Sequence, residues 1–186
     1  MAQPILDEVA KRCRELVRLT VVQGDCLYWV ASSQGAPTGL MYQPALNGQL
    51  TLHTTANGKA WLATLEDDEA SRIAVKGGLG THAVPGHLVG PKALRDVDGL
   101  IRELAQTRSR GFGLAIEEAE QGVKAIAVAV RAHDDQRVLG TMSIAGPLVR
   151  LSPDRDADLY ALLLQAAGTL GLVWPRENVT VFKESQ

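Results

Sequence analysis

The chain has 186 residues, of which 46% are hydrophobic, and its 19 lysines and arginines against 21 aspartates and glutamates give a net charge of -2. This length and apolar content suit a single domain over residues 1–186 with a sizeable core, and no dense basic cluster is present that would bind DNA phosphates directly. No stretch approaches the roughly 20 apolar residues of a membrane span, and the N-terminus does not read as a targeting segment, so we expect a cytoplasmic protein with no membrane partner.

The two cysteines of the chain also fit a protein of the reducing cytoplasm. Cys13 and Cys26 are the only cysteines, and neither belongs to a Cys-x-x-Cys pair. No disulfide framework, metal centre or cofactor is therefore expected. Cys13 falls on the apolar stripe of a predicted helix, where a free cysteine acts as a small buried hydrophobe.

The N-terminal third predicts a helix followed by two strands. Apolar residues recur at helical spacing over residues 5–17. Two apolar runs, residues 19–23 and 26–31, flank Gly24-Asp25, a dipeptide typical of a two-residue hairpin. A loop rich in turn residues follows, and a further turn is expected at Asn47-Gly48.

The stretch over residues 50–63 organises the prediction of function. Residues 50–53 alternate apolar and polar side chains, which predicts a short strand, and Thr54 or Thr55 is suited to cap a helix that follows. The first turn of a helix presents unpaired backbone N–H groups and the positive end of a dipole. A small anion is therefore expected to bind against residues 55–58.

Two more helices are predicted in the middle of the chain. Thr64 is suited to cap the first, which has acidic residues in its opening turn. The irregular segment over residues 77–91 is then either a plain connector or a loop that closes over a ligand. A second helix is expected over residues 93–108, with Gly111 ending it and its arginines complementing its C-terminus.

The last third predicts three extended segments and a long helix. Residues 112–120, 123–130 and 139–145 are the extended segments, with a turn at residues 134–136, and Ser152-Pro153 opens the helix. Because no strand-helix-strand unit repeats along the chain, the predicted fold class is α+β, an antiparallel sheet flanked by helices.

Several catalytic or cofactor motifs fail on inspection. Gly58-Lys59 lacks the other positions of a phosphate-binding loop, and Ser143 lacks the flanking glycines of a nucleophile elbow. Glu117, Glu118 and Glu120 read as a solvated or hydrogen-bonded hairpin edge, and His53 as a structural histidine. The polar groups left for a pocket are few and neutral, which favours binding over catalysis.

Three separated blocks resemble a known family. They are Leu-x-Leu-His-x-x-Ala-x-Gly-Lys-Ala-x-Leu-Ala at residues 50–63, Arg-Ser-Arg-Gly-Phe-Gly followed by Glu-Glu-Ala-Glu-Gln-Gly-Val-Lys-Ala-Ile-Ala within residues 108–127, and Ser-Ile-Ala-Gly-Pro-Leu-Val-Arg-Leu at residues 143–151. Together they are similar to the C-terminal effector-binding domain of IclR-type transcriptional regulators. The resemblance covers essentially the whole chain.

The resemblance implies a GAF-like fold whose pocket binds a small metabolite and controls an N-terminal winged helix that binds DNA. That winged helix is absent from this chain, so DNA contact would occur only through a domain missing here, and the chain would be an excised fragment or a regulator without its reader. The resemblance also implies self-association as a homodimer or homotetramer.

Ligand-binding positions follow from the same resemblance. They are Tyr42, Leu50, Thr55, Ala56, Asn57, Gly58, Ala115, Val123, Ala125, Ser143 and Ala145. Relatives that bind very small oxoacids tend to have an acidic residue in place of Ala115 and a serine in place of Ala145. The site here is then more apolar and roomier, which favours an aromatic or longer aliphatic carboxylate.

Two other classes of function stay open on the sequence. One is a small hydrolase that uses His53 and Lys59. The other is an oligomerisation module whose pocket is closed by its own side chains.

Overall fold

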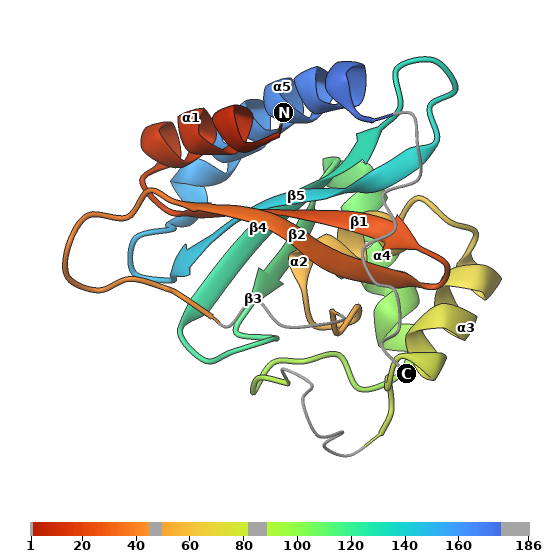
Figure 1. Cartoon of the computed structure of the whole chain (residues 1–186). Helices are drawn as coiled ribbons and strands as arrows, with labels where there is room; N and C mark the ends of the chain where they lie inside the picture. The colour runs from red at the N-terminus through yellow and green to blue at the C-terminus, as the bar shows by residue number, and fades with distance from the viewer. Residues whose placement is uncertain (1, 45–49, 82–88, 176–186) are drawn as a thin grey trace, which may run out of the picture.

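The computed structural model describes residues 2–44, 50–81 and 89–175 of the chain. Its five strands form one antiparallel sheet in the order β2-β1-β5-β4-β3, with helices on both faces (Figure 1). The strands are β1 (Leu16–Gln23), β2 (Cys26–Gln34), β3 (Gly113–Ile116), β4 (Val123–Arg131) and β5 (Val138–Pro147). The α+β prediction is confirmed.

The helices divide between the two faces of the sheet. Two helices, α1 (Gln3–Cys13) and α5 (Asp156–Val173), lie side by side on one face, and a short 3-10 turn at Pro153–Arg155 leads into α5. The other face carries α2 (Ala56–Leu62), α3 (Asp67–Lys76) and α4 (Val97–Arg110). Among the described residues no helix combines the length and apolar character needed to cross a bilayer.

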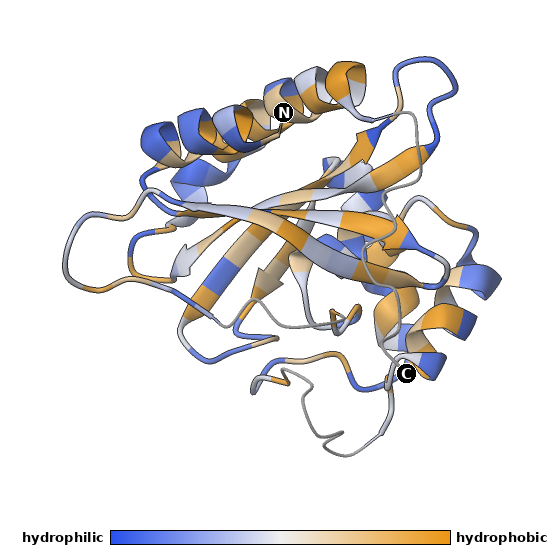
Figure 2. Cartoon of the chain, viewed as in Figure 1, coloured by the Kyte–Doolittle hydropathy of each residue, from blue (hydrophilic) through white to orange (hydrophobic). Residues whose placement is uncertain are grey.

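Each face of the sheet has its own apolar core. Val17 and Leu19 of β1 point towards α1 and α5, where they join Ile126 and Met142 in one cluster. Beneath the other face, residues of α2, α3 and α4 form a second cluster that includes Leu52. Figure 2 shows the resulting pattern, with largely apolar or neutral strands and a hydrophilic turn between β4 and β5.

Most of the predicted helices and strands are present, but several begin or end at other residues than predicted. The hairpin at Gly24-Asp25 is confirmed, and Gly24 has a φ of 59° that suits glycine. The first helix is shorter than predicted, because Arg14 adopts a left-handed conformation with a φ of 60° and ends it. Leu16 and Val17 consequently belong to β1, which begins earlier than the sequence indicated.

The predicted strand over residues 50–53 is wrong. Leu50 makes a single backbone hydrogen bond to the Leu27 carbonyl at 3.1 Å, and the chain then turns. The hydroxyls of Thr54 and Thr55 both donate to the Thr51 carbonyl, at 3.4 and 2.9 Å, which closes that turn. Local side-chain hydrogen bonds to the backbone have replaced the pairing expected of a strand.

Three further boundaries differ from the prediction. Helix α3 is not capped by Thr64, because Glu66 occupies the N-cap position. Helix α4 starts four residues later than predicted, with Asp96 as its cap. The extended segment over residues 112–120 stops at Ile116, since Glu117 has a φ of 56°. The predicted turn at Asn47-Gly48 and most of the irregular segment over residues 77–91 lie outside the described residues.

Candidate ligand-binding cavity

Small side chains on the α2 face of the sheet leave space for a cavity. The strand register places Ala115 beside Ala125, Ala125 beside Ala145, and Ser143 beside Arg18. A cavity that is open to solvent on one side lies over this row. The small side chains of these alanines and of Ser143 therefore form the floor of the cavity.

Helix α2 forms one wall because the sheet allows it to approach closely. A Cβ on Gly113 would lie 2.2 Å from the Ala56 carbonyl oxygen, so only glycine permits this contact between β3 and α2. A buried hydrogen bond also holds α2 against β5. The Asn57 side-chain amide donates to the Thr141 hydroxyl at 2.9 Å, and Thr141 lies 2.6 Å from the Thr20 hydroxyl.

The predicted cap of this helix is confirmed at Thr55. Its hydroxyl accepts a hydrogen bond from the Gly58 amide at 3.1 Å. The Lys59 amide in turn donates to the Thr55 carbonyl at 3.0 Å. Two amides of the first turn are thus already paired within the chain.

The structure brings most of the predicted ligand-binding residues to this cavity. Those that line it are Tyr42, Thr55, Ala56, Asn57, Ala115, Val123, Ala125, Ser143 and Ala145. Leu50 and Gly58 do not line it. Leu50 packs in the core under α3 and α4, and Gly58 lies against the Leu52 backbone, where a Cβ would meet the Leu52 carbonyl oxygen at 2.1 Å.

Arg18 also lines the cavity, and sequence reasoning missed it. The residue is only 4% exposed, and its buried Nε and Nη2 atoms have no hydrogen-bond partner within residues 2–44, 50–81 and 89–175. Burial lowers the pKa of the guanidinium to about 10, with the nearby Tyr42 acting in the opposite direction. Its Cζ atom lies 3.3 Å from the ring centroid of Trp29, a cation-π contact. The available signal was a charged residue between the apolar residues Val17 and Leu19.

Acidic residues from the turn after β3 line the cavity as well. Burial raises the pKa of Glu118 above its ordinary value, while Lys59 acts to lower it. Burial, followed by the charge of Glu120, raises the pKa of Tyr42 to about 12, and the two side chains share a hydrogen bond. The expectation of a site with only neutral polar groups is therefore wrong.

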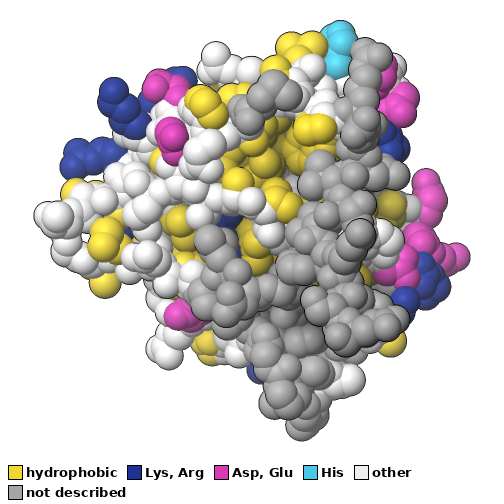
Figure 3. Space-filling view, in the orientation of Figure 1, with side chains coloured by type: hydrophobic (Ala, Val, Ile, Leu, Met, Phe, Trp, Pro, Cys, Tyr) yellow, Lys and Arg dark blue, Asp and Glu magenta, His cyan; other side chains and the backbone are white. Residues whose placement is uncertain are grey.

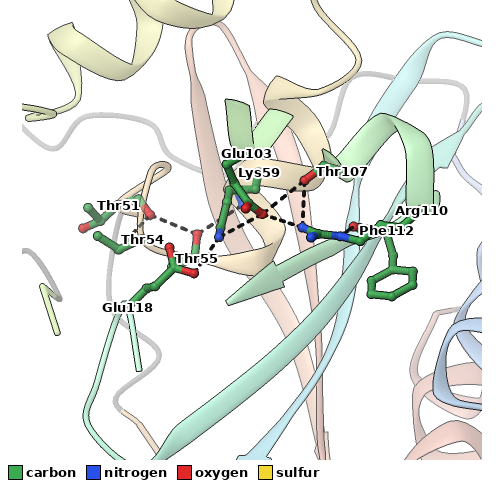
Figure 4. Close-up of polar contacts among 10 residues, drawn as sticks. Thr51, Thr54, Thr55, Lys59, Glu103, Thr107, Arg110, Phe112 and Glu118 are labelled. Carbon is green, nitrogen blue, oxygen red and sulfur yellow. Dashed lines mark hydrogen bonds and ion pairs between the residues drawn. The ribbon is translucent and has the colours of Figure 1, made fainter. Parts of the chain in front are cut away.

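Behind Glu118 lies a buried ionic network that reaches α4 (Figure 4). The Lys59 ammonium donates to Glu118 at 2.7 Å and to Glu103 at 3.3 Å, and Lys59 is only 1% exposed. Glu103 also accepts from Arg110, which donates to Thr107 at 3.0 Å. Such a network positions both α2 and Glu118, because each charge in it has a fixed partner.

The remaining acidic residue has a structural role, as the sequence indicated. Glu117 accepts a hydrogen bond from the Gly122 amide at 3.1 Å and pairs with Lys92 at 2.8 Å. It therefore holds the turn between β3 and β4.

His53 is buried and does not line the cavity. Cys13 is buried as predicted, and burial raises the pKa of its thiol to about 11.

Comparison of the sequence with known proteins gives consistent matches. A family model described as "Bacterial transcriptional regulator IclR C-terminal" matches residues 1–171. The acetate operon repressor of Salmonella typhimurium is 31% identical over 178 residues, which are 94% of this chain and 61% of the repressor. The transcriptional repressor IclR of Escherichia coli is 30% identical with the same coverage. The chain thus spans about three fifths of the length of these relatives.

Solved structures of other transcriptional regulators have a similar fold. A double mutant of the inducer-binding domain of PobR from Acinetobacter, solved with 3-hydroxybenzoic acid, is 23% identical and has a TM-score of 0.76, covering 92% of this chain and 95% of that chain. The C-terminal domain of KdgR from Escherichia coli is 24% identical with a TM-score of 0.72, covering 92% and 96%. The chain belongs to the IclR family of bacterial transcriptional regulators, and it corresponds to their C-terminal domain.

Proposed function

We propose that this chain binds a small organic carboxylate in the cavity between α2 and the sheet, as the effector-binding part of a transcriptional regulator. The observation that carries this proposal is the cavity itself. It has a floor of small side chains, a wall made by the start of α2, and a buried positive charge at Arg18. A concave, mostly apolar site with a few polar groups is typical of small-molecule binding.

An enzymatic role has less support. The hydrolase alternative requires His53 and Lys59 to act on one substrate, but His53 does not line the cavity, and Lys59 is held between two carboxylates. An ammonium in this environment is not available as a nucleophile or base. The relatives are named as repressors and regulators, which also favours a role in regulation.

Bound effector would act on DNA indirectly. We propose that a winged helix outside residues 1–186 contacts DNA in the full-length regulator, and that effector binding shifts the population of arrangements of this domain. Helix α2 is suited to transmit such a shift. It contacts the cavity, and its Lys59 pairs with Glu103 of α4.

Self-association as a dimer or tetramer is part of the same proposal. Large apolar side chains are exposed on β2 and α5, including Val30 at 38% and Leu172 at 62%. Figure 3 shows hydrophobic side chains gathered between these elements on one face of the molecule. Contiguous apolar surface of this kind is typical of association sites. Sedimentation equilibrium should show an oligomer that is weakened by Val30→Asp and unaffected by Leu40→Asp in the loop after β2.

Titration calorimetry tests the binding proposal directly. Purified chain is titrated with a panel of aromatic carboxylates and of aliphatic carboxylates of four to eight carbons. At least one should bind, and Ala125→Phe, which fills the floor of the cavity, should abolish that binding. Leu164→Phe on the exposed side of α5 is the control and should leave affinity unchanged. Failure of the whole panel to bind, or unchanged binding by Ala125→Phe, would contradict the proposal.

A further inference from the structure

Two residues that line the cavity, Arg18 on β1 and Glu118 in the turn after β3, have buried polar atoms without partners in the described part of the chain. On β1, Nε and Nη2 of Arg18 have no hydrogen-bond partner among the residues that the structure describes. In the turn after β3, Oε2 of Glu118 also lacks a hydrogen-bond partner in the described part of the chain. Leaving a buried donor or acceptor unpaired is costly, and more so when the group is charged. Both residues line the cavity, so a ligand there is placed to supply the missing partners.

Arg18 differs from the other buried or partly buried arginines. Arg110 and Arg150 each donate to a carboxylate of this chain, Glu103 and Glu15 respectively. Arg18 instead has the ring of Trp29 against its guanidinium, at 3.3 Å. Stacking uses the flat face of a guanidinium and leaves its in-plane N–H donors available. Those donors match a carboxylate, which accepts two parallel hydrogen bonds from this fork.

Glu118 offers the opposite chemistry. Lys59 donates to its Oε1 at 2.7 Å, which fixes the side chain and leaves Oε2 as an acceptor. In the sheet, β5 and β4 lie between β1, which carries Arg18, and β3, which leads into the turn that carries Glu118. A ligand that lies over β5 and β4 and satisfies both residues therefore carries two polar groups, one facing each side of the cavity.

We infer that the effector is a carboxylate with a hydroxyl or amino group at its far end. The carboxylate accepts hydrogen bonds from Arg18, and the far group donates to Oε2 of Glu118. The body of the ligand crosses the floor formed by Ala125 and Ala145. This inference rests on the proposed function and adds to it the two residues that select the ligand.

Matched probes separate the two contacts. The aromatic set is 3-hydroxybenzoate, 3-hydroxybenzamide and benzoate, and the aliphatic set is 6-hydroxyhexanoate, 6-hydroxyhexanamide and hexanoate. In at least one set the hydroxy acid should bind roughly 10- to 100-fold more tightly than its neutral amide, as expected for hydrogen bonds to a charged group. It should also bind roughly 10-fold more tightly than the acid without the hydroxyl.

Two variants then assign each preference to its residue. Arg18→Met should remove the preference for acid over amide and keep that for the hydroxyl. Glu118→Leu should do the reverse. Arg150→Met, which breaks the ion pair with Glu15 away from the cavity lining, is the control and should keep both preferences. Circular dichroism shows that each variant is folded, and the comparison of probes on the unaltered chain requires no variant.

The outcomes distinguish this inference from the proposed function. Binding of acids and amides with equal affinity, or an acid preference that survives Arg18→Met, would overturn the inference while the cavity remained a binding site. Equal binding of benzoate and 3-hydroxybenzoate, together with equal binding of the aliphatic pair, would overturn the role of Glu118. If no member of either set binds, the inference and the proposed function fall together.

Discussion

The Lys59 ammonium donates to Glu118 at 2.7 Å and thereby joins helix α2 to the turn after β3. Both residues come from elements that line the cavity, and Lys59 is almost fully buried. Breaking a buried ion pair by removing one partner leaves an uncompensated charge, which costs more than the pair itself contributes. The Lys59–Glu118 pair therefore both stabilises the fold and holds two walls of the cavity, α2 and the turn after β3, in place.

Lys59→Met should destabilise the chain strongly. The substitution leaves Glu103 and Glu118 without the ammonium that lies between them, and the expected loss is about 3–5 kcal/mol in the free energy of unfolding. Urea denaturation followed by circular dichroism measures it. The control is Lys76→Met, which removes an exposed pair with Asp25 and should cost less than about 1 kcal/mol. Equal effects of the two substitutions would contradict this account.

Gly113→Ala should disturb the contact between β3 and α2. The added Cβ would lie 2.2 Å from the Ala56 carbonyl oxygen and 2.8 Å from the Ala60 nitrogen, so the helix must shift, at a cost of about 1–3 kcal/mol. Gly168→Ala in α5 meets nothing within 4 Å and should stabilise the chain by about 0.5–1 kcal/mol. Thermal unfolding of the two variants should therefore move in opposite directions.

Thr141→Val should show how much the Asn57 contact contributes. The substitution keeps the shape of the side chain but leaves the buried Asn57 amide without its acceptor, with an expected cost of about 1–3 kcal/mol. The double variant with Asn57→Leu should be less destabilised than the sum of the single variants, because the unpaired amide is then gone. Strict additivity in denaturant unfolding would show that the two side chains are not coupled.

Tyr42 should ionise well above an ordinary tyrosine. Burial and the Glu120 charge raise its pKa to about 12 in the folded chain, against 10.0 in the unfolded chain. Since the folded value is the higher one, the contribution of Tyr42 to stability is complete below pH 10 and is lost as the pH rises towards 12. Absorbance at 295 nm should show this late step, and Tyr42→Phe should remove it. A step at the ordinary pKa would contradict the burial of the phenol.

Local patterns were enough to predict much of the fold. The Gly24-Asp25 hairpin, the long C-terminal helix and the three later strands follow from turn residues and hydrophobic spacing, which depend on neighbours in the chain. The Thr55 cap was predictable for the same reason, since its partner is the Gly58 amide three residues on. The cavity residues could be transferred only through the family resemblance, because they come from separate strands.

Contacts between distant residues explain what the sequence could not predict. Residues 50–53 alternate like a strand, yet two threonine hydroxyls bind the Thr51 carbonyl and turn the chain instead. The sequence did not indicate Arg18, because the lack of an ion-pair partner can be seen only once the chain is folded. No carboxylate of the described chain pairs with it, and only the assembled sheet places it beside Trp29 and Ser143. For Glu118 the sequence left a solvated and a hydrogen-bonded hairpin edge open, because its partner, Lys59, is 59 residues away.

The alanine floor also bears on how this domain could change its ligand. Ala115, Ala125 and Ala145 adjoin one another across three strands, and the backbone hydrogen bonds between those strands do not depend on their side chains. A larger or polar residue at any one of them would shorten the cavity or add a contact without altering the strand register. Under the proposed function, selectivity could therefore evolve by single substitutions at these positions without any change at Arg18.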